Sequence, residues 1–402
     1  MKLLCKTTDL QQALHLVSRA ISNQQALPIL GNILLHAEGK RCTASATDLE
    51  LSIVTSFPAE IENEGAITIP AKAFLNFAQY NTDHEVLLET SEGTQLKCTS
   101  KKAKTLISGE AASEYPTITP IEKETTFPIA AGPLLEALHT VTFAAAKTTL
   151  RPVLSGVYVR SEKGKLVFVA TDSYRLSEYT ITGAKAADIS CIIPTKVFDE
   201  LQSVLGSQKG DNEGQKSEEG PASAKASAGG QEGEDGEKKK KKTESSVDVT
   251  LSSQQIELQA GSTQLLSRLI DGKFPDYQQI IPKSPKTTVK ISVKELLPAV
   301  RRMHYFAKEI NNNLTFHIGK SDMRIITPST QAGRDEAVLP IEMTGSENKI
   351  ALSSSYLLDF LSRVPGEEIE MEITDSQHPA LFRVAGMDAL LHLIMPLRLQ
   401  EE

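Results

Sequence analysis

The chain has 402 residues, of which 40% are hydrophobic and 23% are charged, and its formal net charge is −8. This composition is typical of a globular protein with several domains and argues against one that wraps nucleic acid tightly over its whole surface. No apolar run is long enough to span a membrane, and the first residues lack the apolar core of a signal peptide. The four cysteines are scattered and show no metal-binding spacing, so we expect reduced thiols, a cytoplasmic protein and no metal site.

The predicted elements form three similar sets along the chain, identified from helical and alternating apolar spacing. The first set has helices over 9–21 and 71–79 and strands over 86–88 and 95–99. The second has helices over 132–145 and 196–204 and strands over 165–170 and 247–251. The third has helices over 293–310 and 354–362 and strands over 323–327, 369–373 and 380–384.

Two short motifs repeat with the same spacing. Ala-Thr-Asp occurs at 46–48 and again at 170–172, and Ile-Pro-x-Lys-x-Phe occurs at 69–74 and again at 193–198. Both pairs are separated by 124 positions, which indicates duplicated domains rather than a solenoid, whose period is about 20–50 residues. We therefore predict an α+β fold of three repeated units, each with two helices packed on antiparallel sheets. The predicted domains are 1–123, 124–283 and 284–402.

A low-complexity segment, 206–245, interrupts the second set. It is rich in Gly, Ser, Glu and Lys and contains no aromatic or β-branched apolar residue. Because it cannot bury enough apolar area to offset the entropy of ordering, we expect a disordered loop. Its lysine run at 238–242 favours a nucleic-acid contact, but acidic residues outnumber basic ones in the segment, which favours a solvated loop. A transient DNA or membrane tether is the alternative.

Catalytic motifs are missing from the sequence. It contains no GxxxxGK[ST] or GxGxxG phosphate-binding motif and no GxSxG nucleophile motif. Asp48 and Asp172 are equivalent and resemble paired acids, but an Asp after a strand more often accepts backbone N–H bonds in a turn. Repetition without catalytic residues favours a scaffold. The alternative is an enzyme of three fused α+β domains, such as a nucleotide-handling transferase, which would show a deep pocket with convergent polar groups.

Five segments carry a resemblance to a known family. They are Leu-Pro-Ile-Leu-Gly-Asn at 27–32, Ala-Thr-Asp-Leu-Glu at 46–50, Ala-Thr-Asp-Ser-Tyr-Arg-Leu at 170–176, Arg-Leu-Ile-Asp-Gly-Lys-Phe-Pro-Asp-Tyr at 268–277 and Met-Pro-Leu-Arg-Leu at 395–399. Together they resemble the bacterial sliding clamps, the beta subunits of DNA polymerase III. The resemblance implies a head-to-tail homodimer whose six domains form a ring around double-stranded DNA, with no catalysis and no cofactor. It also implies three kinds of partner: a clamp loader, the replicative polymerase and other proteins with a clamp-binding motif.

A ring that slides on DNA needs sequence-independent contacts with phosphates, which Lys and Arg supply. The resemblance and the predicted helix positions favour the following DNA-facing residues: Arg19, Gln24, Lys72, Lys147, Arg151, Lys196, Arg301, Arg302 and Lys308. Gln24 stands where many members of the family carry Arg, which weakens the contact expected at that loop. A solvated surface cation is the alternative interpretation for each of the charged residues.

The resemblance also implies a groove for partner peptides at the junction of the second and third domains. Its predicted residues are Leu154, Thr171, Ser173, Tyr174, Arg175, Leu176, Pro275, Gln279, Ile280, Leu393, Ile394, Met395, Pro396, Leu397, Arg398 and Leu399. An apolar slot containing a flexible Met suits several different peptides. The alternative is that 393–399 is only a final core strand. The same resemblance predicts a dimer contact in which Lys104 and Leu106 face Tyr305 and Phe306.

Overall fold

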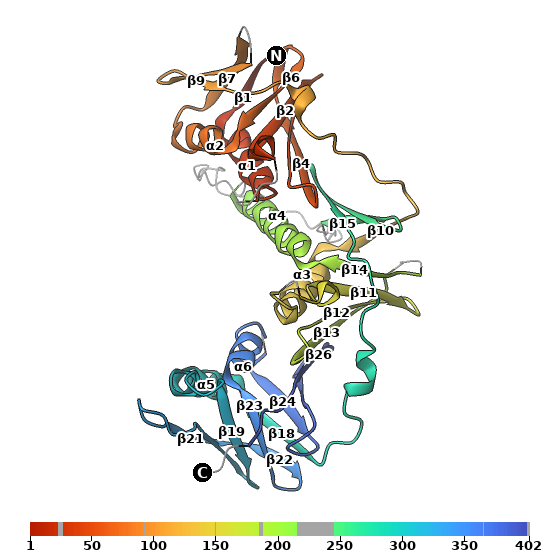
Figure 1. Ribbon diagram of the computed structural model, residues 1–402, viewed down its shortest axis with the longest axis vertical. Helices are drawn as coiled ribbons and strands as arrows, with labels where there is room; N and C mark the ends of the chain where they lie inside the picture. The colour runs from red at the N-terminus through yellow and green to blue at the C-terminus, as the bar shows by residue number, and fades with distance from the viewer. Residues whose placement is uncertain are drawn as a thin grey trace, which may run out of the picture.

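The structure is a computed structural model that describes residues 1–22, 27–91, 94–148, 150–184, 188–214, 245–364 and 366–399, with 207–214 as backbone only. Three α+β units follow one another along an arc, and the first and third units lie at its two ends (Figure 1). The helices lie on the concave side of the arc and the sheets on the convex side. The predicted fold class, with two helices in each unit, is confirmed.

The first unit begins with a strand and an amphipathic helix. Leu10, Leu14 and Val17 recur at helical spacing in α1, and all three are fully buried against the sheet. The elements of this unit are β1 (Lys2–Lys6), α1 (Thr7–Ser18), β2 (Asn32–Glu38), β3 (Arg41–Thr47), β4 (Leu51–Pro58), β5 (Glu60–Asn63), β6 (Gly65–Pro70), α2 (Ala71–Tyr80), β7 (Glu85–Ser91), β8 (Gln95–Thr99) and β9 (Lys104–Ser108).

The second unit repeats this order. Its elements are β10 (Thr125–Ala130), α3 (Ala131–Val141), β11 (Gly156–Glu162), β12 (Lys165–Thr171), β13 (Arg175–Thr182), β14 (Ser190–Pro194), α4 (Thr195–Gly214), β15 (Ser246–Leu251), β16 (Gln255–Ala260) and β17 (Thr263–Arg268). Every residue of β12 after Lys165 is buried, which explains its nearly continuous apolar sequence.

The third unit has the same plan. Its elements are β18 (Thr287–Ser292), α5 (Val293–Ala307), β19 (Asn313–Ile318), β20 (Asp322–Ile326), β21 (Glu336–Pro340), β22 (Glu342–Gly345), β23 (Asn348–Ser353), α6 (Ser354–Leu361), β24 (Glu368–Ile373), β25 (Ala380–Val384) and β26 (Met387–Ile394). No helix in the described part of the chain is long and apolar enough to cross a membrane.

Two of the sheets continue from one unit into the next. One has the order β10-β15-β16-β17-β4-β3-β2-β6, and the other has the order β14-β11-β12-β13-β26-β25-β24-β18-β22. The first crosses from the second unit to the first where β17 pairs with β4, with Leu265 opposite Ile53. The second crosses from the second unit to the third where β13 pairs with β26, with Arg175 opposite Ile394. Backbone hydrogen bonds therefore join all three units.

The boundary predicted for the low-complexity segment is wrong at its first end. Helix α4 continues to Gly214, so residues 206–214 are helical rather than disordered. The physical reason is that adding a residue to an existing helix costs much less than nucleating one, and no proline interrupts this stretch. The rest of the segment, including the lysine run at 238–242, lies outside the described residues between 214 and 245.

Candidate functional site

The turn between β12 and β13 carries several of the predicted docking residues. The Thr171 hydroxyl donates to the Arg175 carbonyl at 2.6 Å, while Asp172 Oδ1 accepts the backbone N–H groups of Tyr174 at 2.9 Å and Arg175 at 3.0 Å. These bonds hold Ser173 in the left-handed region, with φ of 78°. Asp172 therefore accepts backbone N–H groups in a turn, which is the interpretation that the sequence favours.

The turn between β3 and β4 repeats this geometry in the first unit. The Thr47 hydroxyl donates to the Leu51 carbonyl at 3.2 Å, and Asp48 Oδ1 accepts the N–H groups of Glu50 at 3.0 Å and Leu51 at 2.8 Å. Leu49 takes the left-handed conformation with φ of 76°. The repeated Ala-Thr-Asp motif is thus explained by a repeated turn.

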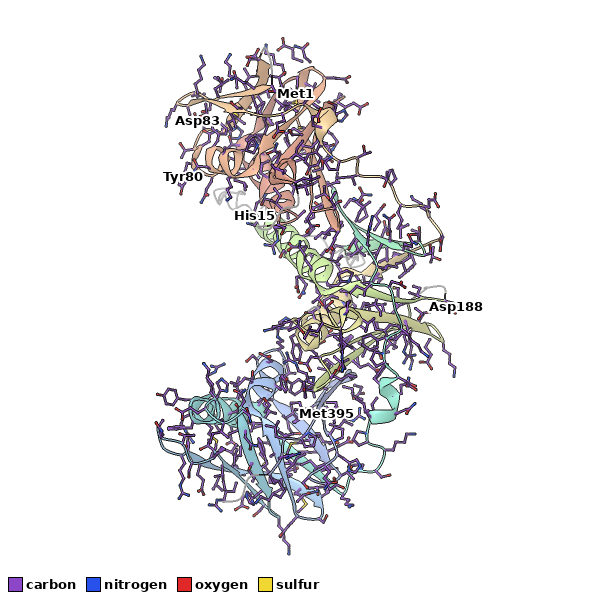
Figure 2. All side chains as sticks on the ribbon, in the orientation of Figure 1. Met1, His15, Tyr80, Asp83, Asp188 and Met395 are labelled. Atoms are coloured by element: carbon purple, nitrogen blue, oxygen red, sulfur yellow. The ribbon has the colours of Figure 1, made fainter. Side chains whose placement is uncertain are left out.

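The chain after β26 is held from both sides at the junction of the second and third units. The Met395 N–H donates to the Tyr174 carbonyl at 2.8 Å, and the Leu397 N–H donates to the Ala351 carbonyl at 2.8 Å. Figure 2 shows Met395 where these two units meet. Residues 395–397 are half-buried and the next two are exposed, so this segment is a partly exposed surface rather than a core strand.

An apolar cluster lies beneath this surface. Leu154 and Leu176 from the second unit and Leu393 from the third belong to it, and Met395 packs against it. The structure therefore brings these four predicted docking residues together from three separate parts of the sequence. Ile394 is also buried, but it belongs to the main core of the molecule instead.

Three of the predicted docking residues are large and exposed: Tyr174 at 62%, Ile280 at 43% and Leu399 at 38%. Tyr174 lies beside the apolar cluster, since its carbonyl accepts the Met395 N–H, and an exposed aromatic side chain there is typical of a binding surface. Leu399 instead lines a cavity of the third unit together with Val338 and Lys349. Gln279 and Pro275 are exposed on the linker between the two units, where Gln279 Nε2 donates to Asp276 Oδ2 at 2.6 Å.

Several residues that shape this junction were missed by the sequence interpretation. Phe274 and Tyr277 in the linker are buried in the apolar cluster, and Tyr158 stacks on Phe274 with ring centroids 4.9 Å apart. Both belong to the Phe-Pro-Asp-Tyr segment at 274–277, whose two aromatic residues are a sequence signal for this packing. Asn313, whose Nδ2 donates to the Arg398 carbonyl at 3.0 Å, has no comparable signal.

Arg175, which the sequence analysis predicts for the groove wall, is a buried cation in the structure. It is only 4% exposed, and its guanidinium contacts Asp172 and Asp359 rather than the surface. Next to it in the junction lies His392, which is fully buried and stacks on Phe360 with ring centroids 4.4 Å apart.

His392 is neutral for a physical reason. The Ser177 hydroxyl donates to the Thr140 carbonyl at 2.7 Å, so His392 Nδ1 donates to the Ser177 oxygen, at 3.1 Å. Nε2 has no hydrogen-bond partner among the described residues. A protonated ring would place an unpaired N–H there. Burial, and then the charge of Arg175, lower the pKa of His392 to about 3.

The predicted DNA-facing cations fall into two groups. Arg19, Lys196 and Arg302 are engaged in ion pairs: Arg19 with Glu200, Lys196 Nζ with Asp48 Oδ2 at 2.5 Å, and Arg302 Nε with Asp335 Oδ2 at 2.8 Å. The remaining cations, Lys72, Lys147, Arg151, Arg301 and Lys308, are exposed. Gln24 lies outside the described residues.

The ion pair between Lys196 and Asp48 affects the pKa of Asp48. Burial alone would raise the pKa of Asp48, but its hydrogen bond to Lys196, the backbone N–H groups of its turn and the charge of Lys196 together hold the pKa below its ordinary value. The ion pair joins α4 of the second unit to a turn of the first, so Lys196 has a role inside the protein.

The predicted dimer residues lie at opposite ends of the arc (Figure 1). Lys104 and Leu106 are on β9, the last strand of the sheet β5-β1-β7-β8-β9. Tyr305 and Phe306 are on α5, close to the sheet β21-β20-β19-β23, and their rings pack edge to face at 5.3 Å. Within one chain these two pairs are far apart, so any contact between them needs a second copy.

Family models of all three domains of the DNA polymerase III beta subunit match the chain. The N-terminal domain matches residues 1–119, the central domain 129–214 and the C-terminal domain 278–398. The chain belongs to the DNA polymerase III beta subunit family. A beta sliding clamp from Synechocystis is 28% identical over 422 residues, which covers 99% of this chain and 100% of that protein.

Solved structures of this family show the same fold over their whole length. The DNA polymerase III beta subunit of Thermotoga maritima aligns with a TM-score of 0.85 and 26% identity, covering 99% of this chain and 100% of that one. The DNA polymerase sliding clamp of Bacillus subtilis aligns with a TM-score of 0.86 and 25% identity, covering all of both chains. The resemblance inferred from five short segments is therefore confirmed.

The enzyme alternative predicts a deep pocket with convergent polar groups, so the described cavities bear on it. One of about 780 Å³ lies beside the second unit's strand edges and is lined by charged residues including Glu124, Asp188 and Arg268. The only thiol lining it, Cys191, has its pKa raised to about 12 by burial, which makes it a poor nucleophile at neutral pH. Among the described residues, no group of three or more His, Cys, Asp or Glu could hold a metal ion.

The buried, neutral His392 predicts a specific pH dependence. Its folded pKa of about 3 lies below its ordinary value of 6.5, so its contribution to stability is complete above pH 6.5 and falls as the pH drops towards 3. Between about pH 6.5 and pH 5 this single group should cost about 2 kcal/mol of unfolding free energy.

His392→Phe keeps an aromatic ring stacked on Phe360 but cannot titrate. Urea unfolding at about pH 7 and about pH 5 should show the variant losing about 2 kcal/mol less stability than the parent between the two conditions. Equal losses in the two proteins would show that protonation of His392 is not linked to unfolding.

Proposed function

We propose that this protein is a DNA sliding clamp, which encircles duplex DNA and tethers the replicative polymerase and other DNA-handling proteins without catalysis of its own. Membership of the beta subunit family supports this function. The observation that carries it is the pair of sheets that continue from unit to unit, because this mode of joining can be repeated until a ring closes. The proposed domains are 1–123, 124–283 and 284–402.

The strand order supports a head-to-tail dimer. By their place in the repeat, β4, β13 and β21 are equivalent, and so are β9, β17 and β26. Inside the chain β4 pairs with β17 and β13 pairs with β26, which leaves β21 and β9 at the ends of their sheets. Pairing β9 of one copy with β21 of another uses the same contact a third time and closes six units into a ring.

Exposed apolar side chains support the same contact. Leu106 on β9 is 56% exposed, Val338 on β21 is 57% exposed and Tyr305 on α5 is 70% exposed. Large apolar side chains at both free edges are expected where two edges meet in a dimer and are a liability in a monomer.

The first test of the proposal is the oligomeric state. Light scattering at micromolar concentration should give about twice the chain mass of 43.7 kDa. Leu106→Asp buries a charge in the seam and should weaken the dimer at least about tenfold. Leu150→Asp is a matched control, since Leu150 is 89% exposed and lies in neither edge. A monomeric parent would count against the ring.

The second test concerns encirclement itself. A topological link should make the loaded protein persist on circular DNA and slide off when the DNA is cut once. We expect the protein to be lost from linearised DNA of any sequence, because contacts between exposed cations and phosphates do not distinguish one base from another. Gel filtration of the loaded DNA before and after a single restriction cut measures this retention. Equal retention on circular and linear DNA would contradict encirclement.

We also propose that the surface at the junction of the second and third units binds peptides of the clamp loader, the polymerase and other partners. Support comes from the apolar cluster that contains Leu154 and against which Met395 packs, and from the exposed Tyr174, whose carbonyl accepts the Met395 N–H. An apolar surface containing a flexible methionine accommodates peptides of different sequence.

Leu154→Ala with Met395→Ala tests this surface. Each change removes apolar contacts worth roughly 1–3 kcal/mol, so a synthetic Gln-x-x-Leu-Phe peptide should bind at least about tenfold more weakly by calorimetry. DNA retention should survive, because the concave helices and the free edges are elsewhere. Leu49→Ala, in the equivalent turn of the first unit, is the control. Unchanged peptide affinity in a folded double variant would show that the surface is misplaced.

A further inference from the structure

Arg175 is a buried cation at the junction of the second and third units. Its side chain is 4% exposed, although it begins a strand beside the docking surface. A buried charge is tolerated only where hydrogen bonds and opposite charges replace its water. The contacts of this guanidinium therefore show what it does.

The guanidinium joins two carboxylates from different units. Nε donates to Asp172 Oδ2 at 3.0 Å, and Nη1 donates to Asp359 Oδ2 at 2.6 Å. Asp172 lies in the turn before β13, whereas Asp359 lies on α6 of the third unit. The guanidinium also lies 4.7 Å from the ring centroid of Tyr356 on α6 and 5.4 Å from that of Phe143 in the second unit. Both units therefore contact the same planar cation.

The turn that Arg175 holds is the one that supports the docking surface. Asp172 uses one carboxylate oxygen for Arg175 Nε and the other for the N–H groups of Tyr174 and Arg175. The Tyr174 carbonyl in turn accepts the Met395 N–H at 2.8 Å. A chain of contacts thus runs from α6 through Asp359, Arg175 and Asp172 to both walls of the surface.

The first junction achieves the same connection with different residues. Asp48 is the repeat equivalent of Asp172, and it pairs with Lys196 on α4. Glu200 on α4 is the repeat equivalent of Asp359, and it pairs with Arg19. Two cations, Lys196 and Arg19, thus bind the two acids whose equivalents Arg175 binds alone at the second junction. The repeat equivalent of Arg175 in the first unit is Leu51, which is 2% exposed. Both junctions therefore link a turn to the next unit's second helix.

We propose that Arg175 is a positioning residue, which locks the turn at 171–175 to α6 and thereby fixes the docking surface without contacting the bound peptide. The effect of this role on the binding of partner peptides rests on the proposed docking function. The lock itself does not, because it is made of contacts within the chain.

Two substitutions on opposite sides of the junction test the lock in the full-length protein. Arg175→Met keeps an unbranched apolar side chain but removes the charge, and Asp359→Asn removes one acceptor charge from α6. Each should weaken binding of a synthetic Gln-Leu-Ser-Leu-Phe peptide about three- to tenfold. The double variant should bind no more weakly than Arg175→Met alone, because both changes break one lock, and Arg175→Lys should restore part of the affinity.

The matched control is Glu367→Gln. It removes an ion pair with Lys294 that lies on the same unit but is highly exposed, so peptide affinity should not change. A loss of affinity in Arg175→Met without any loss in Asp359→Asn would overturn the proposal in favour of direct contact with the peptide. Unchanged affinity in both variants would overturn it as well.

Hydrogen exchange at the Met395 amide separates this proposal from the docking function. The exchange should be faster in Arg175→Met and in Asp359→Asn than in the parent, since the Tyr174 carbonyl that accepts this N–H is no longer held. If the parent fails to bind the peptide, the docking function fails while faster exchange still supports the lock. Unchanged exchange in both variants overturns the lock whatever the peptide does.

Discussion

The polar groups at the edge of a β-sheet need partners, and this requirement determines how the three units are joined. In each unit, one sheet would end at the third strand after the first helix, which is β4, β13 or β21. Another sheet would end at the last strand of the unit, which is β9, β17 or β26. Neither edge is satisfied within its own unit. Pairing of β17 with β4 and of β13 with β26 satisfies two of the three edge pairs inside the chain. The positions of the helices depend on this strand pairing, because their apolar faces cover the concave sides of sheets that are already continuous.

The junction of the second and third units combines three kinds of interaction in one place. Strand pairing brings Ile394 opposite Arg175, an apolar cluster surrounds Leu393, and a buried cation joins two acids. The surface above this junction is built from both units, so it exists only while they keep their relative orientation. A partner that binds there therefore recognises the assembled arrangement of two units rather than either one alone.

The helices were predictable from the sequence because apolar spacing and flanking residues are local signals. The structure confirms all six, although α1 ends at Ser18 instead of 21 and α5 at Ala307 instead of 310. The extent of α4 was not predictable, since the composition of 206–214 resembles a loop while the preceding helix propagates into it.

The candidate site was predictable only in part. Leu154, Leu176, Leu393 and Met395 could be chosen through the family resemblance, and they do share one cluster. That Arg175 points inwards could not be foreseen, because its partner Asp359 is 184 residues away in sequence. Lys196 illustrates the same limit. Its place at a helix start suggested DNA contact, but its partner is fixed by how the turn at Asp48 meets α4.

The different charges at the two junctions have a consequence for the order of the units. If the third unit directly followed the first within one chain, Asp48 would face Ser355, the repeat equivalent of Lys196, and a mostly buried acid would lack its cation. A junction between two copies of the second unit would instead bring Arg175 and Lys196 to the same carboxylate. The units are therefore alike in fold but not exchangeable in position, and electrostatics encodes their order along the chain.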